Sequence, residues 1–179
     1  MKILILCGSP HKNGTTNALA DALISGVDGS KHEIEKIFVT EKKIAPCLGC
    51  DACRHNGGVC VQKDDMGSVL QSILDADLVV FASPLYYFGF TAQLKAVIDR
   101  FYAANTSLRA QPEKKAILLT AGGGSEAWIM DGILANYRTM LRYLNWKDEG
   151  TICAYGCHVK DQLQQTDYPE AAKKLGQSL

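Results

Sequence analysis

The chain alternates short, continuously apolar runs with longer segments in which apolar residues recur every three or four positions. Runs such as KILILC (2–7) and KAILLTA (115–121) show no polar–apolar alternation. Strands of this kind are buried on both faces, as in parallel sheets. The pattern predicts five strands, at residues 2–7, 32–39, 77–83, 115–121 and 149–156. The second is more polar, which is typical of a strand at a sheet edge.

The segments between the strands are predicted to be helices, because their apolar residues, such as Leu19, Leu23 and Val27, share one helix face. Asp64 or Asp65 is available to cap the second helix and Ser125 to cap the fourth. The predicted helices cover residues 16–27, 65–76, 91–104, about 125–145, and the tail from about 167.

Five strand–helix units predict an α/β fold with three layers, in which helices cover both faces of a doubly wound, five-stranded parallel sheet. The expected strand order is the flavodoxin-like 2-1-3-4-5, with a ligand at the carboxyl ends of the first and third strands. The 179 residues fit one domain, 1–179, with a cysteine-rich insertion at about 41–63. Since the insertion leaves from the carboxyl edge of the sheet, we expect it near the ligand.

The loop after the first strand, CGSPHKNGTTN (7–17), leads into a helix N-terminus, where unpaired N–H groups and the helix dipole favour a phosphate. Gly14 permits a tight wrap, Ser9, Thr15 and Thr16 offer hydroxyls, and Lys12 offers a positive charge. A polar turn that only caps the helix would have a similar composition. The loop lacks the lysine of a GxxxxGK[ST] motif, the GxGxxG fingerprint, and the arginine of a Cys-x5-Arg phosphatase loop, whose position is Asn13.

Two further carboxyl-end loops are unusual. SPLYYFGF (83–90) places four aromatic residues in a loop, which favours a flat aromatic ligand or, alternatively, a subunit interface. TAGGGSEAW (120–128) has three consecutive glycines, which permit close approach of backbone to a ligand or make a merely flexible loop. A phosphate site beside a flat-ring site at this position in the fold points to FMN.

Three segments resemble the family of NAD(P)H-dependent FMN reductases and iron–sulfur flavoproteins. GSPHKNGTT is similar to the family's GSPRKxGNT loop, and SPLYYFGFTAQLKAVIDR to its SPxYFxxxxxxLKxxIDR stretch. PCLGCDACRHNGGVCVQKDDM resembles its cysteine insertion, and the likeness covers roughly residues 2–125. Two positions depart from the family pattern: His11 stands for the usual arginine and Thr15 for the usual asparagine. Lys12 is the cation expected to compensate.

The resemblance implies that FMN carries the redox chemistry, so no side chain is assigned a catalytic role. NADH or NADPH would deliver hydride, and a small-molecule acceptor such as a quinone, a nitro or azo compound or a flavin would receive the electrons. The family also implies a homodimer or homotetramer, with the aromatic loop and Tyr102 at the contacts. The implied cofactor-binding residues are Ser9, His11, Lys12, Gly14, Thr15, Thr16, Pro84, Leu85, Tyr86, Tyr87, Phe88, Ala121, Gly122 and Gly123.

Four of the seven cysteines follow the spacing C-x2-C-x2-C-x6-C. Three closely spaced thiolates fit a [4Fe–4S] cluster better than zinc, whose sites pair a CxxC with a distant second pair. By resemblance to the iron–sulfur flavoproteins, Cys47, Cys50, Cys53 and Cys60 are the implied ligands. Reduced thiols or an oxidised pair remain alternatives. Cys153 and Cys157 are expected to pack, and Cys7 to be inert.

Lys plus Arg and Asp plus Glu each number 19, so charge gives no argument for nucleic acid or an anionic membrane surface. No apolar stretch approaches the length that spans a bilayer, and we expect a cytoplasmic location.

The sequence leaves two candidate functions: an FMN-dependent NAD(P)H oxidoreductase, and an iron–sulfur flavoprotein that carries electrons from ferredoxin. A binding module without redox chemistry has little support.

Overall fold

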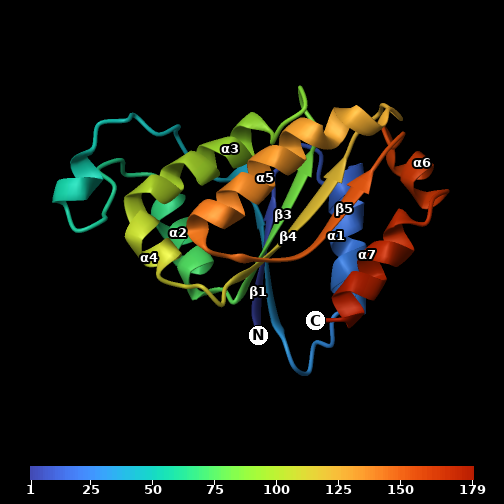
Figure 1. Cartoon of the computed structure of the whole chain (residues 1–179), viewed down its shortest axis with the longest axis horizontal. Helices are drawn as coiled ribbons and strands as arrows, with labels where there is room; N and C mark the ends of the chain where they lie inside the picture. Colours follow the sequence, from blue (N-terminus) through green and yellow to red (C-terminus); the bar gives the residue numbers. More distant parts are fainter.

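The computed structural model describes all 179 residues, and a five-stranded parallel sheet forms its centre (Figure 1). The strand order is β2-β1-β3-β4-β5, which confirms the predicted topology, and β2 is an edge strand as expected. The fifth strand begins two residues before the predicted start. The strands are β1 Lys2–Cys7, β2 Glu33–Phe38, β3 Leu78–Pro84, β4 Lys115–Ala121 and β5 Lys147–Ala154.

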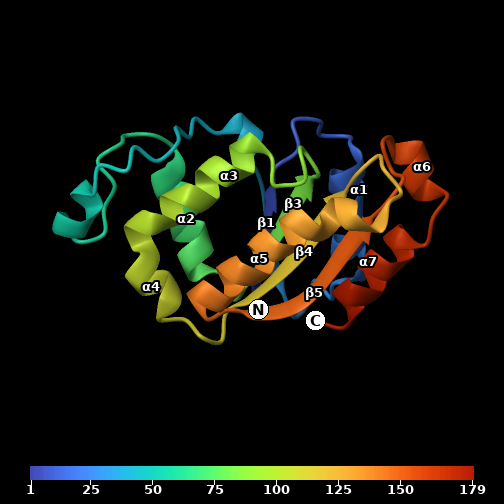
Figure 2. The ribbon, with the colours of Figure 1, turned by 45° about the horizontal axis from the view of Figure 1, so that its top comes forward.

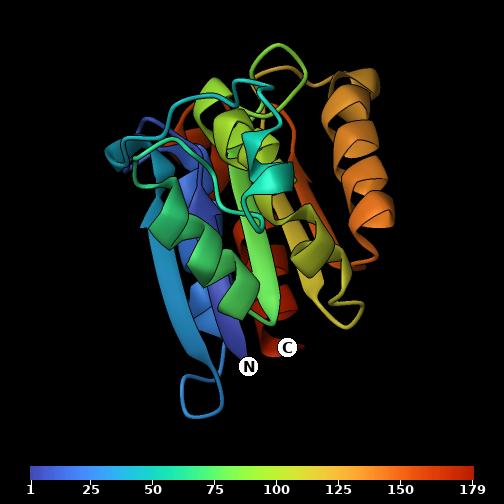
Figure 3. The same ribbon diagram turned by 90° about the vertical axis from the view of Figure 1, so that its left-hand side faces the viewer.

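Helices cover both faces of the sheet, so the three predicted layers are present (Figures 1 and 3). One face packs against α1 (Thr15–Gly26), α6 (Lys160–Gln164) and α7 (Tyr168–Gln177). The other packs against α2 (Met66–Asp75), α3 (Ala92–Asp99), α4 (Asn105–Arg109) and α5 (Asp131–Leu144). Alternate residues of β1 and β3 contribute to opposite cores, because successive side chains of a strand point to opposite faces.

One expected helix start differs from the structure, and one expected cap residue makes a different contact. α5 begins at Asp131 rather than near Ser125, because the chain after β4 runs extended and then makes a short 3-10 helix, η4 (Ala127–Met130). The Ser125 amide donates to the carboxylate of Glu126 (3.1 Å), so Ser125 caps no helix. Asp65 occupies the N-cap of α2, but its carboxylate accepts from the Lys43 amide (2.7 Å) instead of capping the helix.

The 41–63 insertion projects outward beside α2, α3 and α4 and carries one short 3-10 helix, η2 (Ala52–His55) (Figures 1 and 2). Asp64 joins the two ends of the insertion. Its carboxylate accepts hydrogen bonds from the Ala45 amide (3.0 Å) and from both terminal nitrogens of Arg100 (2.8 and 3.1 Å). Arg100 also donates to the Ala45 carbonyl (2.9 Å). It belongs to a second 3-10 helix, η3 (Arg100–Ala104), which continues α3. No helix of the structure is long and apolar enough to cross a membrane.

Candidate functional site

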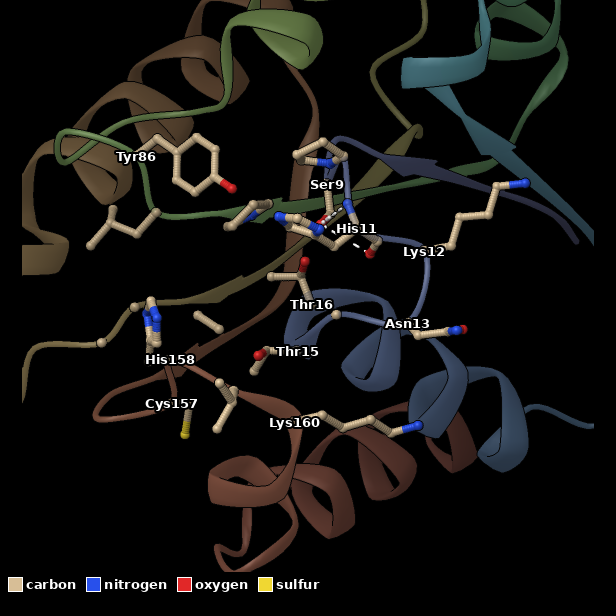
Figure 4. A pocket seen from close by; sticks show the side chains of 18 residues that line it. Ser9, His11, Lys12, Asn13, Thr15, Thr16, Tyr86, Cys157, His158 and Lys160 are labelled. Atoms are coloured by element: carbon tan, nitrogen blue, oxygen red, sulfur yellow. Dashed lines mark hydrogen bonds between the residues drawn. The ribbon is translucent and has the colours of Figure 1, made fainter.

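A cavity of about 720 Å³ opens at the carboxyl edge of the sheet, at the switch point between β1 and β3 (Figure 4). Four segments at the carboxyl ends of the strands line it. They are residues 9–16 after β1, 84–86 after β3, 121–123 after β4 and 157–160 after β5. The first three are the loops that the sequence indicates. The predicted residues at the cavity are Ser9, His11, Lys12, Gly14, Thr15, Thr16, Pro84, Leu85, Tyr86, Ala121, Gly122 and Gly123.

The N-terminus of α1 faces this cavity without a side-chain cap and without an acidic residue in its first turn. The first N–H groups of a helix have no intrahelical partner, and here no side chain replaces one. The hydroxyl of Thr16 is buried and has no hydrogen-bond partner. A buried unpaired polar group is costly, so these groups suit an anion that accepts their hydrogen bonds.

Internal hydrogen bonds hold the first loop in shape. The Asn17 side-chain amide donates to the carbonyls of His11 and Lys12, both at 3.0 Å, and the Gly14 amide donates to the His11 carbonyl (2.9 Å). The Ser9 hydroxyl accepts from the His11 amide (3.1 Å), so it shapes the loop. A Cβ on Gly14 would lie 3.0 Å from the His11 carbonyl oxygen, which is tighter than ordinary contact. Glycine therefore permits the wrap.

Four basic side chains line the cavity, those of Lys12, Lys160 and the histidines His11 and His158, and no carboxylate does. Lys12, however, forms an ion pair with Glu41 and lies 5.4 Å from the centroid of the Phe38 ring. Figure 4 shows its side chain extending away from Thr16. In this structure Lys12 therefore does not take the place of the family's arginine, and the α1 N-terminus supplies the main attraction for an anion.

The loops after β3 and β4 form another part of the cavity lining. The Leu85 amide donates to the Ala121 carbonyl (2.9 Å), which fixes the loops after β3 and β4 side by side. Tyr86 lies at the rim, and its ring is exposed on one side (Figure 4). Tyr87 and Phe88 do not line this cavity, although the sequence predicts it. They form the tip of a two-residue turn closed by the Tyr86–Gly89 backbone hydrogen bonds.

The fourth of these segments, the loop after β5, was not predicted from the sequence. It contributes Cys157, His158, Val159 and Lys160 to the cavity lining. Backbone hydrogen bonds from Gly156 to Gly124 and from Cys157 to Gly122, both 2.8 Å, fix this loop against the glycines after β4. The His158 ring packs over Gly123. The position of this loop at the carboxyl end of the fifth strand was the signal that could have indicated it. Cys157 was expected only to pack; it is buried and also borders the cavity.

The four clustered cysteines lie on the insertion, outside this cavity. All are free, and they line one small hollow together with Arg100 and Tyr102. No three His, Cys, Asp or Glu side chains converge closely enough to hold a metal ion.

The guanidinium of Arg100, beside this hollow, has a raised pKa. Burial alone would lower the pKa of Arg100, but the hydrogen bonds and charge of Asp64, with a smaller effect of Cys60, raise it.

The insertion was expected near the ligand, but within one chain its cysteines lie outside the cavity, and only its first residue, Glu41, pairs with a residue of the cavity lining, Lys12. None of its cysteines lines the large cavity, and it projects from the opposite side of the molecule to the β5 loop and α6 (Figures 1 and 2). The Arg100–Asp64 contact directs the base of the insertion toward η3 rather than toward the carboxyl-end loops.

The fold and the cavity define a flavodoxin-like α/β protein with a cavity at its topological switch point. Residues 1–147 match the family of NADPH-dependent FMN reductases, and the chain belongs to that family.

Three relatives illustrate the likeness. An iron–sulfur flavoprotein of Archaeoglobus fulgidus is 41% identical over 100 residues, which cover 56% of this chain and 45% of the relative. YwqN of Bacillus subtilis, named as an NAD(P)H-dependent FMN-containing oxidoreductase, is 25% identical over 98% of this chain and 96% of its own length. The solved NAD(P)H:quinone oxidoreductase of Methanothermobacter marburgensis superimposes with a TM-score of 0.77 at 18% identity, over 99% and 95% of the two chains. The chain spans about half the length of the two iron–sulfur flavoproteins from Archaeoglobus fulgidus and Methanocaldococcus jannaschii that it matches, 45% and 51%.

Proposed function

We propose that the protein is an FMN-dependent NAD(P)H oxidoreductase that passes electrons from a reduced nicotinamide to a small organic acceptor. The observation that carries the proposal is the uncapped N-terminus of α1 with the buried, unpaired Thr16 hydroxyl, at the switch point of a flavodoxin-like sheet. Membership of the FMN reductase family supports the same ligand.

The residues present fit FMN. The α1 N-terminus and the hydroxyls of Thr15 and Thr16 would hold the phosphate, and the absence of carboxylates from the cavity favours a dianion. Pro84, Leu85 and Tyr86 on one side, and Ala121, Gly122 and Gly123 on the other, would border the ring. His158 over Gly123 adds a hydrogen-bonding group at that end. Bound FMN would supply two-electron hydride chemistry, and the chain would bind, orient and shield it.

The overall reaction balances without a protein acid or base. A hydride from NADH or NADPH carries two electrons and one proton equivalent; a quinone acceptor takes both electrons, that proton equivalent and one further proton from solvent to become a hydroquinone. We accordingly assign no side chain a proton-transfer role.

The test is direct. Purified protein is loaded with FMN, desalted and assayed for oxidation of NADH and of NADPH, with ferricyanide and menadione as acceptors. We expect a flavin absorption band that survives desalting and FMN-dependent turnover with at least one nicotinamide. A protein that retains FMN yet oxidises neither nicotinamide with any acceptor would disprove the oxidoreductase proposal, and one that retains no FMN would disprove the site.

A second candidate function is an iron–sulfur flavoprotein that receives electrons from ferredoxin. The four cysteines around one hollow and the iron–sulfur flavoproteins among the relatives favour it. The donor set suits a [4Fe–4S] cluster, but the thiols do not converge on a centre, so we derive no step through one. Anaerobic reconstitution with iron and sulfide, followed by iron and sulfide analysis, tests this candidate. Fewer than about one iron per chain would remove it.

We also propose that the protein acts in the cytoplasm as a single domain and assembles as a homodimer or homotetramer. A groove between η3, α4 and α5 supports self-association, because it is lined partly by Tyr102, Met140 and Tyr143. Light scattering across a concentration series tests it, and a monomer at all concentrations would contradict it.

A further inference from the structure

Lys12 borders the cavity, but its ammonium group is held outside it. The ammonium forms an ion pair with the carboxylate of Glu41 and lies 5.4 Å from the centroid of the Phe38 ring. Glu41 does not line the cavity; it lines a separate hollow between β2, α2 and the 3-10 helix η1 (Val39–Glu41). The ion pair therefore draws the ammonium away from the proposed phosphate site, and Figure 4 shows the Lys12 side chain pointing away from Thr16.

Two groups at the end of β2 act together on Lys12. Phe38 ends β2 opposite Cys7, the residue from which the loop after β1 starts. The centroid of its ring lies 5.1 Å from the ammonium of Lys36 as well as 5.4 Å from that of Lys12. Because the face of an aromatic ring attracts cations, Phe38 adds to the attraction that the Glu41 carboxylate exerts. The position of the ammonium outside the cavity is thus stabilised by both a ring and a charge.

The backbone is fixed on both sides of this ion pair. The Lys12 carbonyl accepts from the side-chain amide of Asn17 (3.0 Å), which ties Lys12 to α1. Just after Glu41, the Lys43 amide donates to the Asp65 carboxylate (2.7 Å), and the Asp65 amide donates to the Lys43 carbonyl (2.9 Å). Rotation of the long Lys12 side chain is therefore the motion that can carry its ammonium from Glu41 toward the cavity.

The Lys12–Glu41 pair is open to competition because it is exposed. The side chains of Lys12 and Glu41 are 60% and 49% exposed. An ion pair with this exposure contributes little net free energy, since water and salt screen it and two long side chains must be ordered. Lys12 lies just before Gly14, the N-cap of α1, where a phosphate monoester would bring close to two negative charges. The Glu41 carboxylate and the phosphate therefore compete for one ammonium group.

We propose that Glu41 is a positioning residue for Lys12, which holds the ammonium out of the phosphate site and so weakens the binding of the flavin phosphate. The inference rests on the proposed function, because the phosphate in question is that of FMN. Glu41 is also the first residue of the cysteine insertion, so the ion pair connects the insertion to the cofactor site. Removal of the charge of Glu41 frees Lys12 to contact the phosphate.

Flavin binding can be measured independently of turnover. Glu41→Gln keeps the size of the side chain and removes its charge, and we expect it to tighten FMN binding about 5-fold, as for one exposed charge pair gained. Riboflavin, which has the ring but no phosphate, should bind the variant and the wild type equally. Flavin fluorescence titration gives both dissociation constants. Glu113→Gln, which breaks the exposed pair with Lys147 at the amino end of the sheet, is the matched control and should leave FMN affinity unchanged.

A double-mutant cycle shows whether Glu41 acts through Lys12. In the E41Q background, Lys12→Met should weaken FMN binding about 5-fold, because the freed ammonium is lost. In the wild type, where Glu41 already withholds the ammonium, the same substitution should cost less than about 2-fold. The gain in E41Q should also shrink at high salt, which screens exposed charges. Equal costs of Lys12→Met in the two backgrounds would mean that the two residues act independently, and would overturn the proposal.

The remaining outcomes are decisive as well. An FMN affinity that falls or stays the same in E41Q would overturn the proposal. A gain that riboflavin shares would also overturn it, since the change would then come from packing around the ring and not from the phosphate. Both results leave the proposed function standing as long as the wild type binds FMN and oxidises a nicotinamide. If neither the wild type nor any variant binds FMN, the proposed function and this inference fail together.

Discussion

Thr16 is the side chain on which the proposed cofactor site depends most. Its hydroxyl is buried at the first turn of α1 and donates to nothing in the protein. A hydrogen bond to a charged phosphate contributes about 1.5–3 kcal/mol, so Thr16→Ala should weaken FMN binding about 10-fold or more. Fluorescence titration of FMN measures the dissociation constant. Thr106→Ala, an exposed threonine on α4, is the control, and equal affinities for both variants and the wild type would contradict the assignment.

The cysteines differ in exposure and therefore in expected reactivity. Burial raises the pKa of Cys7 and of Cys153 to about 11, and it also raises the pKa of Cys157. A raised pKa leaves little thiolate at neutral pH, whereas Cys47 and Cys50 are exposed. In metal-free native protein, iodoacetamide should label Cys47 and Cys50 well before Cys7. Mass spectrometry of timed digests gives the order, and early labelling of Cys7 would contradict it.

Among the structural elements, the insertion depends on one buried ion pair. The Arg100 side chain is 2% exposed and that of Asp64 13%, and removing one partner of a buried pair costs about 3–5 kcal/mol. Asp64→Asn should therefore lower the free energy of unfolding by about 3 kcal/mol in urea. The exposed pair Lys95–Asp99 on α3 is the matched control, and Asp99→Asn should cost less than about 1 kcal/mol. Similar costs for the two variants would contradict the role of Arg100.

The same ion pair predicts a pH dependence. Burial alone would raise the pKa of Asp64, but hydrogen bonds from Arg100 and from the Ala45 and Met66 amides lower it below its usual range. A carboxyl group with a lowered pKa stabilises the folded state above its ordinary pKa near 4, and this contribution is lost as the pH falls through the folded-state value. The stability difference between wild type and Asp64→Asn should thus shrink below about pH 4. A difference independent of pH would contradict the pairing.

At the scale of the whole molecule, we expect cooperative unfolding and stabilisation by FMN. Both cores share every inner strand, so calorimetry should show one transition for residues 1–179. FMN at 100 times its dissociation constant adds about 2.7 kcal/mol, or a rise in Tm of about 5–10 °C. Riboflavin, which lacks the phosphate, is the control and should give a smaller rise. Two transitions would contradict a single domain, and equal rises would contradict the phosphate site.

Much of the fold could be predicted because its signals are local in sequence. Continuous apolar runs specify strands buried on both faces, and the right-handedness of crossovers restricts the order in which parallel strands can lie. The loop from Ser9 to Thr16 could be predicted for the same reason, since its glycine, its hydroxyls and the helix that follows are contiguous.

The tertiary structure decided what depends on contacts between distant residues. It placed His158 at the cavity because β5 ends beside β4, and it paired Lys12 with Glu41 rather than with the anion site. It brought Phe88 into contact with Trp128, since η4 delays the start of α5. It also directed the cysteine insertion away from the cavity through Arg100 and Asp64, which are 36 residues apart. Local patterns in the amino-acid sequence are enough to predict the sheet and the loop after β1, whereas the side chains that complete each site depend on long-range packing and pairing, which no local pattern encodes.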